Sequence, residues 1–183
     1  VSIDTFRSSV AARTIHKYGK VIINDISAGE LDPLIVDVVA EHDVPYVAMH
    51  MKGDPRTMQS MTDYRDIVAE VVDYFRERTA QLRERGVRRI VVDPGFGFAK
   101  TLEQNYELLR GLHSLAELGY PVLAGVSRKS MIYKLLGTTP AEALNGTTAL
   151  HWECLRQGAV ILRAHDTREA VEVVRMFDQF MQA

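Results

Sequence analysis

Six short apolar runs, each followed by polar residues, recur along the 183-residue chain. The runs are rich in Val and Ile and do not alternate with polar positions, which is typical of strands buried on both faces of a parallel sheet. We expect strands at residues 1–3, 21–23, 45–49, 90–92, 121–126 and 159–162.

The segments between these strands carry apolar residues at helical spacing, together with helix start and stop signals. Thr101 with Gln104, and Thr139 with Glu142, have the spacing of capping boxes. We expect helices at about residues 6–17, 33–42, 62–85, 101–118, 140–158 and 168–180, and a short one before Gly137.

Strands that alternate with helices predict an α/β protein with a parallel sheet of right-handed βαβ units. An open doubly wound sheet and a (β/α)8 TIM barrel both have this pattern. No G-x-G-x-x-G motif follows the first strand, which argues against a dinucleotide-binding doubly wound sheet. Polar residues end every strand, which favours the barrel, because all strands of a barrel point their carboxyl ends at one mouth.

A complete barrel needs eight strands, whereas the pattern here supplies six, and the first strand begins at Val1. No linker or internal repeat divides the chain. We therefore expect residues 1–183 to form a single domain that holds strands 3–8 of a barrel and is truncated at its N-terminal end.

Composition narrows the classes of partner. The formal net charge is −2, so no basic field attracts nucleic acid or an anionic membrane. Cys154 is the single cysteine, which excludes an intrachain disulfide and favours a reducing, cytoplasmic compartment. Its helical context predicts a small core residue rather than a nucleophile. No apolar run reaches the roughly 18 residues of a membrane helix.

Three strand ends carry groups suited to a flat, polar heterocycle. The carboxylates of Asp4 and Asp93 can each accept two parallel hydrogen bonds from an N–C–N edge, and Asn24 adds a donor and an acceptor. The alternative is that each residue only caps the helix that follows it. Apolar walls for such a ring are offered by Ile26, Met49 and Phe98.

The last two strand ends carry cations. Lys129, Arg163 and His165 follow the expected fifth and sixth strands, where barrel enzymes often bind phosphate. Arginine offers a fork of donors to phosphate oxygens and lysine a point charge. The alternative is a surface cluster, or partners for Asp166 and Glu169. Carboxylates on one side and cations on the other suit a substrate with a polar ring and a phosphate tail.

The strand ends together resemble the dihydropteroate synthase family, over the whole chain and in order. The resemblance implies a (β/α)8 barrel and a transferase of folate biosynthesis. That reaction joins 6-hydroxymethyl-7,8-dihydropterin pyrophosphate to p-aminobenzoate, with Mg²⁺, and gives 7,8-dihydropteroate and pyrophosphate. It also implies competition by sulfonamides and a homodimer. The motifs that carry the resemblance are Ser2–Thr5, Ile23–Ile26, Met49–Met51 with Gly53, Pro55 and Thr57–Gln59, Asp93–Phe98, Ser127–Ser130 and Arg163–Asp166.

The resemblance also implies roles for individual residues. The catalytic set would be Asp4, Lys129, Arg163 and His165. The family's metal ligand belongs to the part of the barrel before Val1, so no metal ligand is expected in this chain. Arg163 and His165 would hold the pyrophosphate, and Phe98, Ser127 and Lys129 would border p-aminobenzoate. The pterin would be bound by Asp4, Asn24, Ile26, Met49, Asp93, Phe98, Gly125, Lys129 and Arg163.

Two other functions fit parts of the pattern. A methyltetrahydrofolate-binding corrinoid methyltransferase domain shares the carboxylate and amide reading of a pterin ring, but its methyl transfer has no pyrophosphate to release. The basic strand ends therefore favour the synthase. A non-catalytic pterin-binding fragment is the second alternative. Because two βα units are expected to be missing, we expect this chain to bind pterin weakly and to turn over poorly.

Overall fold

The computed structural model describes residues 1–53 and 56–182, so Pro55 of the family resemblance lies outside the described residues. Strands β1 to β4 form one parallel sheet in that order, and β5 pairs in parallel with β6. A parallel bridge between Val92 and Val122 joins the two. The strands are β1 (Ser2–Asp4), β2 (Ile22–Asp25), β3 (Tyr46–Met49), β4 (Ile90–Asp93), β5 (Leu123–Ala124) and β6 (Ile161–Leu162).

This order confirms the predicted parallel α/β fold. Strands that are consecutive in the chain are neighbours in space. A doubly wound sheet instead reverses its strand order at a switch point. The consecutive order therefore removes the open alternative and leaves a wall of strands whose carboxyl ends all lie on one side.

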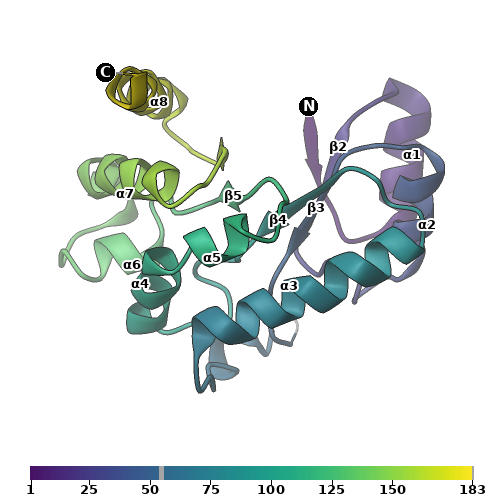
Figure 1. The fold of residues 1–183 in the computed structure, drawn as a ribbon, viewed down its shortest axis with the longest axis horizontal. Helices are drawn as coiled ribbons and strands as arrows, with labels where there is room; N and C mark the ends of the chain where they lie inside the picture. The colour runs from purple at the N-terminus through teal and green to yellow at the C-terminus, as the bar shows by residue number, and fades with distance from the viewer. Residues whose placement is uncertain (54–55, 183) are drawn as a thin grey trace.

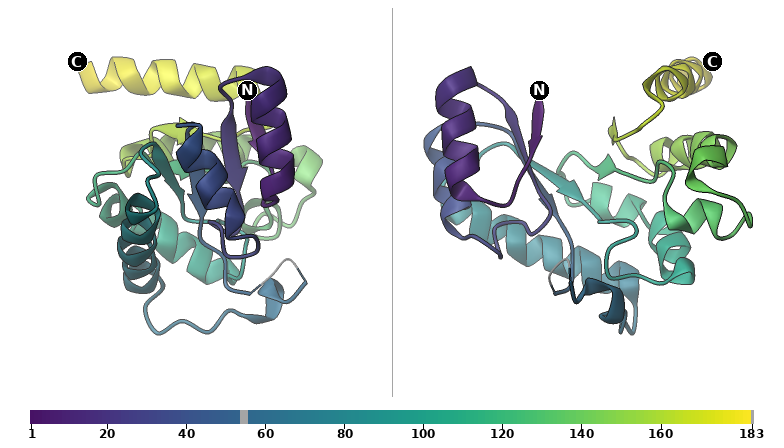
Figure 2. Two further views of the ribbon diagram at one scale, coloured as in Figure 1. Left: turned by 90° about the vertical axis from the view of Figure 1, so that its right-hand side faces the viewer. Right: turned by 180° about the vertical axis from the view of Figure 1, so that it is seen from behind.

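The helices lie in an arc outside the strands, with α1 and α8 at its opposite ends (Figures 1 and 2). None of the helices in the described part of the chain is long and apolar enough to cross a bilayer. The helices are α1 (Ser8–Tyr18), α2 (Leu34–Glu41), α3 (Ile67–Glu84), α4 (Leu102–Arg110), α5 (His113–Ala116), α6 (Ser130–Tyr133), α7 (Leu144–Arg156) and α8 (Thr167–Gln182), with 3₁₀ turns η1 (Met58–Ser60) and η2 (Pro140–Glu142).

The two faces of the sheet have different neighbours. Side chains that point outward, such as Ile23, Tyr46 and Val92, belong to the main core under the helices. Side chains one position along, such as Val47 and Val91, instead line a cavity of about 320 Å³ on the inner face. Successive side chains of a strand point to opposite faces, so they alternate between the helix-covered core and the inner cavity.

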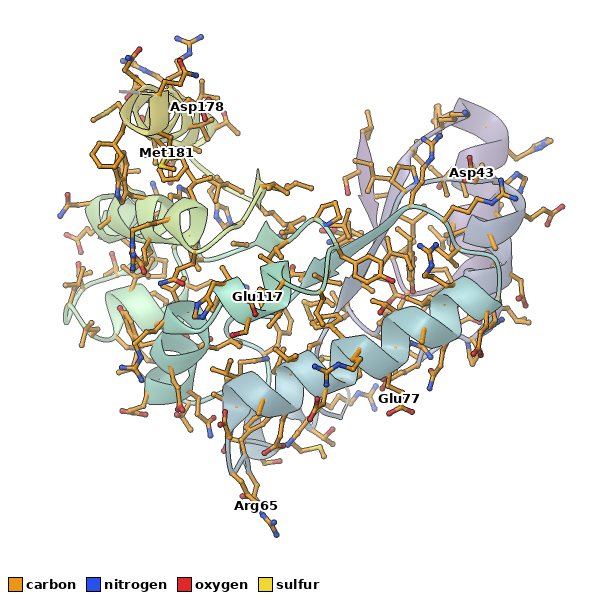
Figure 3. The ribbon with its side chains drawn as sticks, in the orientation of Figure 1. Asp43, Arg65, Glu77, Glu117, Asp178 and Met181 are labelled. Atoms are coloured by element: carbon orange, nitrogen blue, oxygen red, sulfur yellow. The ribbon has the colours of Figure 1, made fainter. Side chains whose placement is uncertain are left out.

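Several local expectations are confirmed. Both capping boxes form, at Thr101 with Gln104 and at Thr139 with Glu142. Cys154 is fully buried in the core, and burial raises the pKa of its thiol to about 12, so it is a packing residue. In α3, Ile67, Phe75 and Leu82 are buried. Glu77 of the same helix and Arg65 before it lie on the outer side of the molecule (Figure 3).

The long helix begins five residues later than expected, at Ile67 rather than Thr62. The Asp66 side chain accepts a hydrogen bond from the Ala69 amide and caps the helix there. Glu70 then accepts from the Arg65 amide at 2.7 Å. These carboxylates satisfy the first free amides of the helix, so residues before Asp66 gain nothing by becoming helical.

The helix expected over 101–118 is two helices, α4 and α5, separated at Gly111. A Cβ at Gly111 would lie 2.7 Å from Val68 Cγ2, so the glycine permits close packing against α3. Three further elements are shorter than expected. The helix over 140–158 is divided into η2 and α7, and the strands over 121–126 and 159–162 are reduced to 123–124 and 161–162.

A buried carboxylate fixes the loop after β2. Asp25 accepts hydrogen bonds from the Ser27 amide and hydroxyl through Oδ1. Its Oδ2 accepts from the Gly29 amide at 2.8 Å and from the Tyr46 hydroxyl at 2.7 Å. Because Asn24 and Ile26 flank Asp25, this network sets the position of both neighbours.

We expect Tyr46→Phe to lower the free energy of unfolding by about 2 kcal/mol, because it removes one donor from a buried carboxylate. Tyr46 itself is fully buried. Urea denaturation followed by circular dichroism measures the change. Tyr18→Phe is the matched control, since Tyr18 is exposed. A loss below about 0.5 kcal/mol at Tyr46, the usual range of surface substitutions, would contradict this account.

Candidate functional site

The register of the sheet brings polar strand ends together. Asp4 lies opposite Asn24 on neighbouring strands, and Met49 lies opposite Asp93. These ends surround a pocket of about 410 Å³, within the range of about 300–1,000 Å³ that is typical of small-molecule sites. The pocket is lined by Asp4, Thr5, Phe6, Arg7, Asn24, Ile26, Met49, Asp93, Phe98, Gly125, Lys129 and Arg163, which include every residue expected to bind pterin.

Asp93 is the buried carboxylate of this pocket, with only 6% of its surface exposed. Its Oδ1 accepts a hydrogen bond from the Gly95 amide at 2.8 Å. Burial raises the pKa of Asp93, while the charge of Lys129 acts in the opposite direction. Gly95 has a φ of +70°, and a Cβ there would lie 2.1 Å from the His50 carbonyl oxygen, so this turn requires glycine.

Lys129 reaches the same pocket from the segment before α6. Its Nζ donates to the Phe96 carbonyl and lies 4.9 Å from the centre of the Phe98 ring. Burial lowers the pKa of Lys129 to about 8, and the nearby Asp93 carboxylate partly offsets this effect. A Cβ at Gly125 would lie 3.8 Å from this Nζ, so glycine leaves space beside the ammonium.

The side-chain amide of Asn24 has a hydrogen-bond partner at its nitrogen but none among the described residues at its oxygen. Its Nδ2 donates to Asp4 Oδ1, whereas its Oδ1 is buried and has no partner among the described residues. A buried polar atom without a partner is costly and points to a missing donor. The amide therefore offers an acceptor to a ligand in the pocket.

Asp4 also forms an ion pair with Arg163, the residue that follows the last strand, β6. Arg163 Nη2 donates to Asp4 Oδ2 at 2.7 Å. The side chains of Arg163 and Asp4 are 53% and 56% exposed, so this pair is weak and open to competition by a stronger anion. The guanidinium is thus placed at the mouth of the pocket, where a negatively charged group would enter.

Ser127 and His165 lie together, but neither lines the pocket itself. The Ser127 hydroxyl is buried, accepts from the His165 amide at 3.1 Å and lies 3.0 Å from His165 Nδ1. With Nδ1 engaged, Nε2 is the ring nitrogen left for a ligand. The roles expected for these two residues stay predictions.

Arg128, the residue before Lys129, is bound to Asp166 and to backbone carbonyls and does not line the pocket. It forms two hydrogen bonds to the Asp166 carboxylate, at 2.7 and 2.8 Å, and donates to two backbone carbonyls. A guanidinium held at four contacts is structural, which separates Arg128 from its neighbour Lys129.

Three lining residues were not expected from the sequence. Thr5, Phe6 and Arg7 follow β1 and line the pocket beyond Asp4. The Arg7 guanidinium lies 5.7 Å from the centre of the Phe6 ring. Only their position after the first strand could have predicted this role, because the loops after all strands of a barrel lie at the same end.

The expectation of Mg²⁺ rests on the family resemblance alone. The described part of the chain contains no group of three or more His, Cys, Asp or Glu residues placed to hold one. The expectation of Mg²⁺ therefore stays a prediction, and no chemical step below depends on it.

Comparison with known proteins gives a consistent result. The profile of the family described as pterin binding enzyme matches residues 1–165. A dihydropteroate synthase from Synechocystis sp. is 41% identical over 181 residues, which are 97% of this chain and 62% of that protein. This chain thus spans less than two thirds of that relative.

Two solved structures are similar as well. Dihydropteroate synthase from Thermus thermophilus in complex with 6HMPPP has a TM-score of 0.92 and 40% identity, covering 98% of this chain and 71% of that one. The Yersinia pestis dihydropteroate synthase with a sulfonamide drug complex has a TM-score of 0.94 and 33% identity, covering 100% of this chain and 66% of that one. The chain therefore belongs to the pterin binding enzyme family, in which its relatives are dihydropteroate synthases.

Proposed function

We propose that this chain carries the pterin-binding part of a dihydropteroate synthase. The observation that carries the proposal is the buried Oδ1 of Asn24, which has no partner among the described residues and belongs to the pocket that also holds Asp93. An amino-pyrimidine ring offers donors to both groups at once. The match to the family over residues 1–165 supports the same ligand class.

In this proposal, polar side chains bind the edge of the pterin ring and apolar side chains pack on its faces. The Asp93 carboxylate accepts parallel hydrogen bonds from the N–C–N edge of the pterin, and Asn24 reads the adjacent positions. Met49 and Phe98 give apolar walls for the flat ring, and both line the pocket. Lys129 sits over the Phe98 ring and contacts the carbonyl side of the pterin.

The proposed reaction is loss of pyrophosphate followed by attack of the p-aminobenzoate nitrogen on the pterin methylene carbon. The first step breaks the carbon–oxygen bond and leaves a cation conjugated to the ring. Asp4 stabilises this positive charge, while Arg163 and His165 stabilise the departing anion. No side-chain nucleophile is needed, since the aniline nitrogen supplies the electron pair and then loses its proton.

The fold is proposed to be the larger part of an eight-stranded barrel. Its strands are consecutive neighbours, and residues of all six strands line an inner cavity of about 320 Å³. The chain also spans 62% of its Synechocystis relative. The homodimer, the cytoplasmic location and the p-aminobenzoate contacts of Phe98, Ser127 and Lys129 stay predictions.

The methyltransferase alternative is disfavoured by the mouth of the pocket. Among the described residues, the Arg163 guanidinium donates to the exposed Asp4 carboxylate, and it can exchange that partner for a phosphate oxygen. Release of pyrophosphate uses such a cation, whereas methyl transfer from methyltetrahydrofolate has no comparable anion to hold.

Asp93→Asn should weaken binding of a dihydropterin by about 2 kcal/mol, or roughly thirtyfold, because it removes the charge that accepts two hydrogen bonds. Isothermal titration calorimetry measures the affinity. Asp178→Asn is the matched control, since Asp178 is exposed on α8 (Figure 3). Equal affinities for the unchanged chain and Asp93→Asn would refute the role of Asp93 at the ring edge.

Arg163→Met should reduce affinity about tenfold for 6-hydroxymethyl-7,8-dihydropterin pyrophosphate. It should lower the affinity for the same pterin without pyrophosphate by a smaller factor, since Arg163 also lines the pocket. Calorimetry with both ligands isolates the contribution of the pyrophosphate. Arg168→Met serves as control, because Arg168 contacts only Glu172 on the surface of α8 in the described contacts. A similar loss for both ligands would favour the methyltransferase alternative.

The 183-residue chain should convert substrates far more slowly than a version extended to the full length of its relatives, because it spans 62% of its Synechocystis relative and holds six of the eight βα units of the proposed barrel. Release of pyrophosphate, followed with a coupled assay, compares the two. Comparable rates would show that the residues described above suffice for turnover.

A further inference from the structure

A buried lysine lies beneath the turn that presents Asp93. Lys100 is 6% exposed and belongs to no strand or helix. Its Nζ donates to the Gly95 carbonyl at 3.1 Å and to the Phe98 carbonyl at 2.9 Å, and lies 3.1 Å from His50 Nδ1. It does not line the pocket, so it acts on the turn from behind.

Every contact of a charged Lys100 can be a hydrogen bond that the ammonium donates. An ammonium has three protons, and three acceptors surround it. His50 is neutral, because burial and the nearby Lys100 and Lys52 lower the pKa of its ring to about 2. Its Nδ1 can therefore accept a hydrogen bond from Lys100. A neutral amine donates only two hydrogen bonds, and both lack the strength that the ammonium charge gives.

The turn has a second anchor that carries no charge. Asn105 is buried, and its Oδ1 accepts from the Gly97 amide at 2.6 Å. Its Nδ2 donates to the Thr101 carbonyl at 2.6 Å. Lys100 therefore fixes the two ends of the turn and Asn105 fixes its middle. Lys129 holds the turn from the pocket side, at the Phe96 carbonyl, so of the two anchors behind the turn only Lys100 carries a charge.

Charged groups face Lys100 from several elements. Burial lowers the pKa of Lys100 to about 7, the Asp93 carboxylate raises it, and Lys129 and Lys52 lower it further. In return, the charge of Lys100 lowers the pKa of Asp93. Two tyrosines stand near His50, Tyr74 at 4.9 Å and Tyr64 at 6.2 Å between ring centres. Burial raises the pKa of both tyrosines well above neutral, so they stay uncharged.

We infer that Lys100 is a positioning residue for pterin recognition: from behind the turn, its ammonium holds the Gly95 and Phe98 carbonyls and keeps the Asp93 carboxylate charged. The inference rests on the proposed function. It adds that pterin affinity is coupled to the charge of a residue that never touches the ligand.

The coupling has a definite sign. Below pH 7, Lys100 carries its charge and Asp93 accepts the pterin edge as a carboxylate. As pH rises above about 7, Lys100 loses its proton, its hydrogen bonds to the turn lose their charge, and affinity falls. The effect on folding is opposite: the unfolded chain binds more protons than the folded one between pH 7 and about 10.4, so this residue makes the fold more stable as pH rises through that window.

The first test needs no ligand. Carbon-13 NMR of the Asp93 carboxyl group gives its pKa in the unchanged chain, in Lys100→Met and in Lys100→Arg. We expect Lys100→Met to raise the Asp93 pKa by about one unit and Lys100→Arg to keep it near the original value. The control is Lys134→Met, because Lys134 is exposed at the end of α6. An unchanged Asp93 pKa in Lys100→Met would overturn the inference.

The second test measures dihydropterin affinity by calorimetry from pH 6 to pH 9. Lys100→Met should bind about tenfold more weakly at pH 6.5 and should lose the fall in affinity near pH 7, retaining a later fall near pH 8 from Lys129. In the unchanged chain, the NMR titration of the Lys100 side chain should coincide with the fall near pH 7. This comparison needs no variant, and a mismatch of the two midpoints would overturn the coupling.

The two tests separate the inference from the function on which it rests. If the unchanged chain binds no dihydropterin, the proposed function and the coupling to affinity both fail, while the Asp93 titration still decides whether Lys100 keeps that carboxylate charged. If the unchanged chain binds dihydropterin and Lys100→Met binds it equally well at pH 6.5, the proposed function stands and the inference fails.

Discussion

A negative charge held away from water is the constraint on which the rest of this site depends. Asp93 is almost fully buried, and burial alone favours its neutral form. Lys129, the Gly95 amide, Lys100 and Arg163 together favour the carboxylate. The site is therefore a small cluster of charges around the Asp93 carboxylate. The cations that line the pocket are also held by contacts with other groups. Lys129 binds a carbonyl of the turn, and Arg163 reaches across the mouth to Asp4.

The sequence was sufficient to predict those site residues whose position follows from the regular geometry of a parallel sheet. Asp4, Asn24 and Asp93 each end an apolar run, and strands in register bring such ends to one side. The same logic could not find Lys100 or Asp25. Their importance comes from contacts with loop carbonyls and amides, which no periodic pattern records. Arg128 and Lys129 are adjacent cations in the sequence, and only their contacts distinguish a structural residue from one that faces the pocket.

The helices were predictable as elements but not in their bounds. Gly111 looked like an ordinary interior position of a helix, yet it is the point where α3 approaches too closely for any side chain. Asp66 fixes the start of α3 because its side chain accepts a hydrogen bond from the Ala69 amide, as short polar side chains often do at helix ends. In both cases a tertiary contact or a local hydrogen bond overrode a periodic pattern that was otherwise correct.

The contact between Arg163 and Asp4 has a consequence for how the chain acquires its binding site. The two residues are 159 positions apart, so their meeting closes nearly the whole chain into a loop. Contacts of such long sequence separation are the slowest to form, because the entropy of closing the loop is lost before the contact gives anything back. The strand pairs between them join segments much closer in sequence. On this basis we expect the pair of Arg163 and Asp4 to form after the strand pairs that lie between them in the sequence.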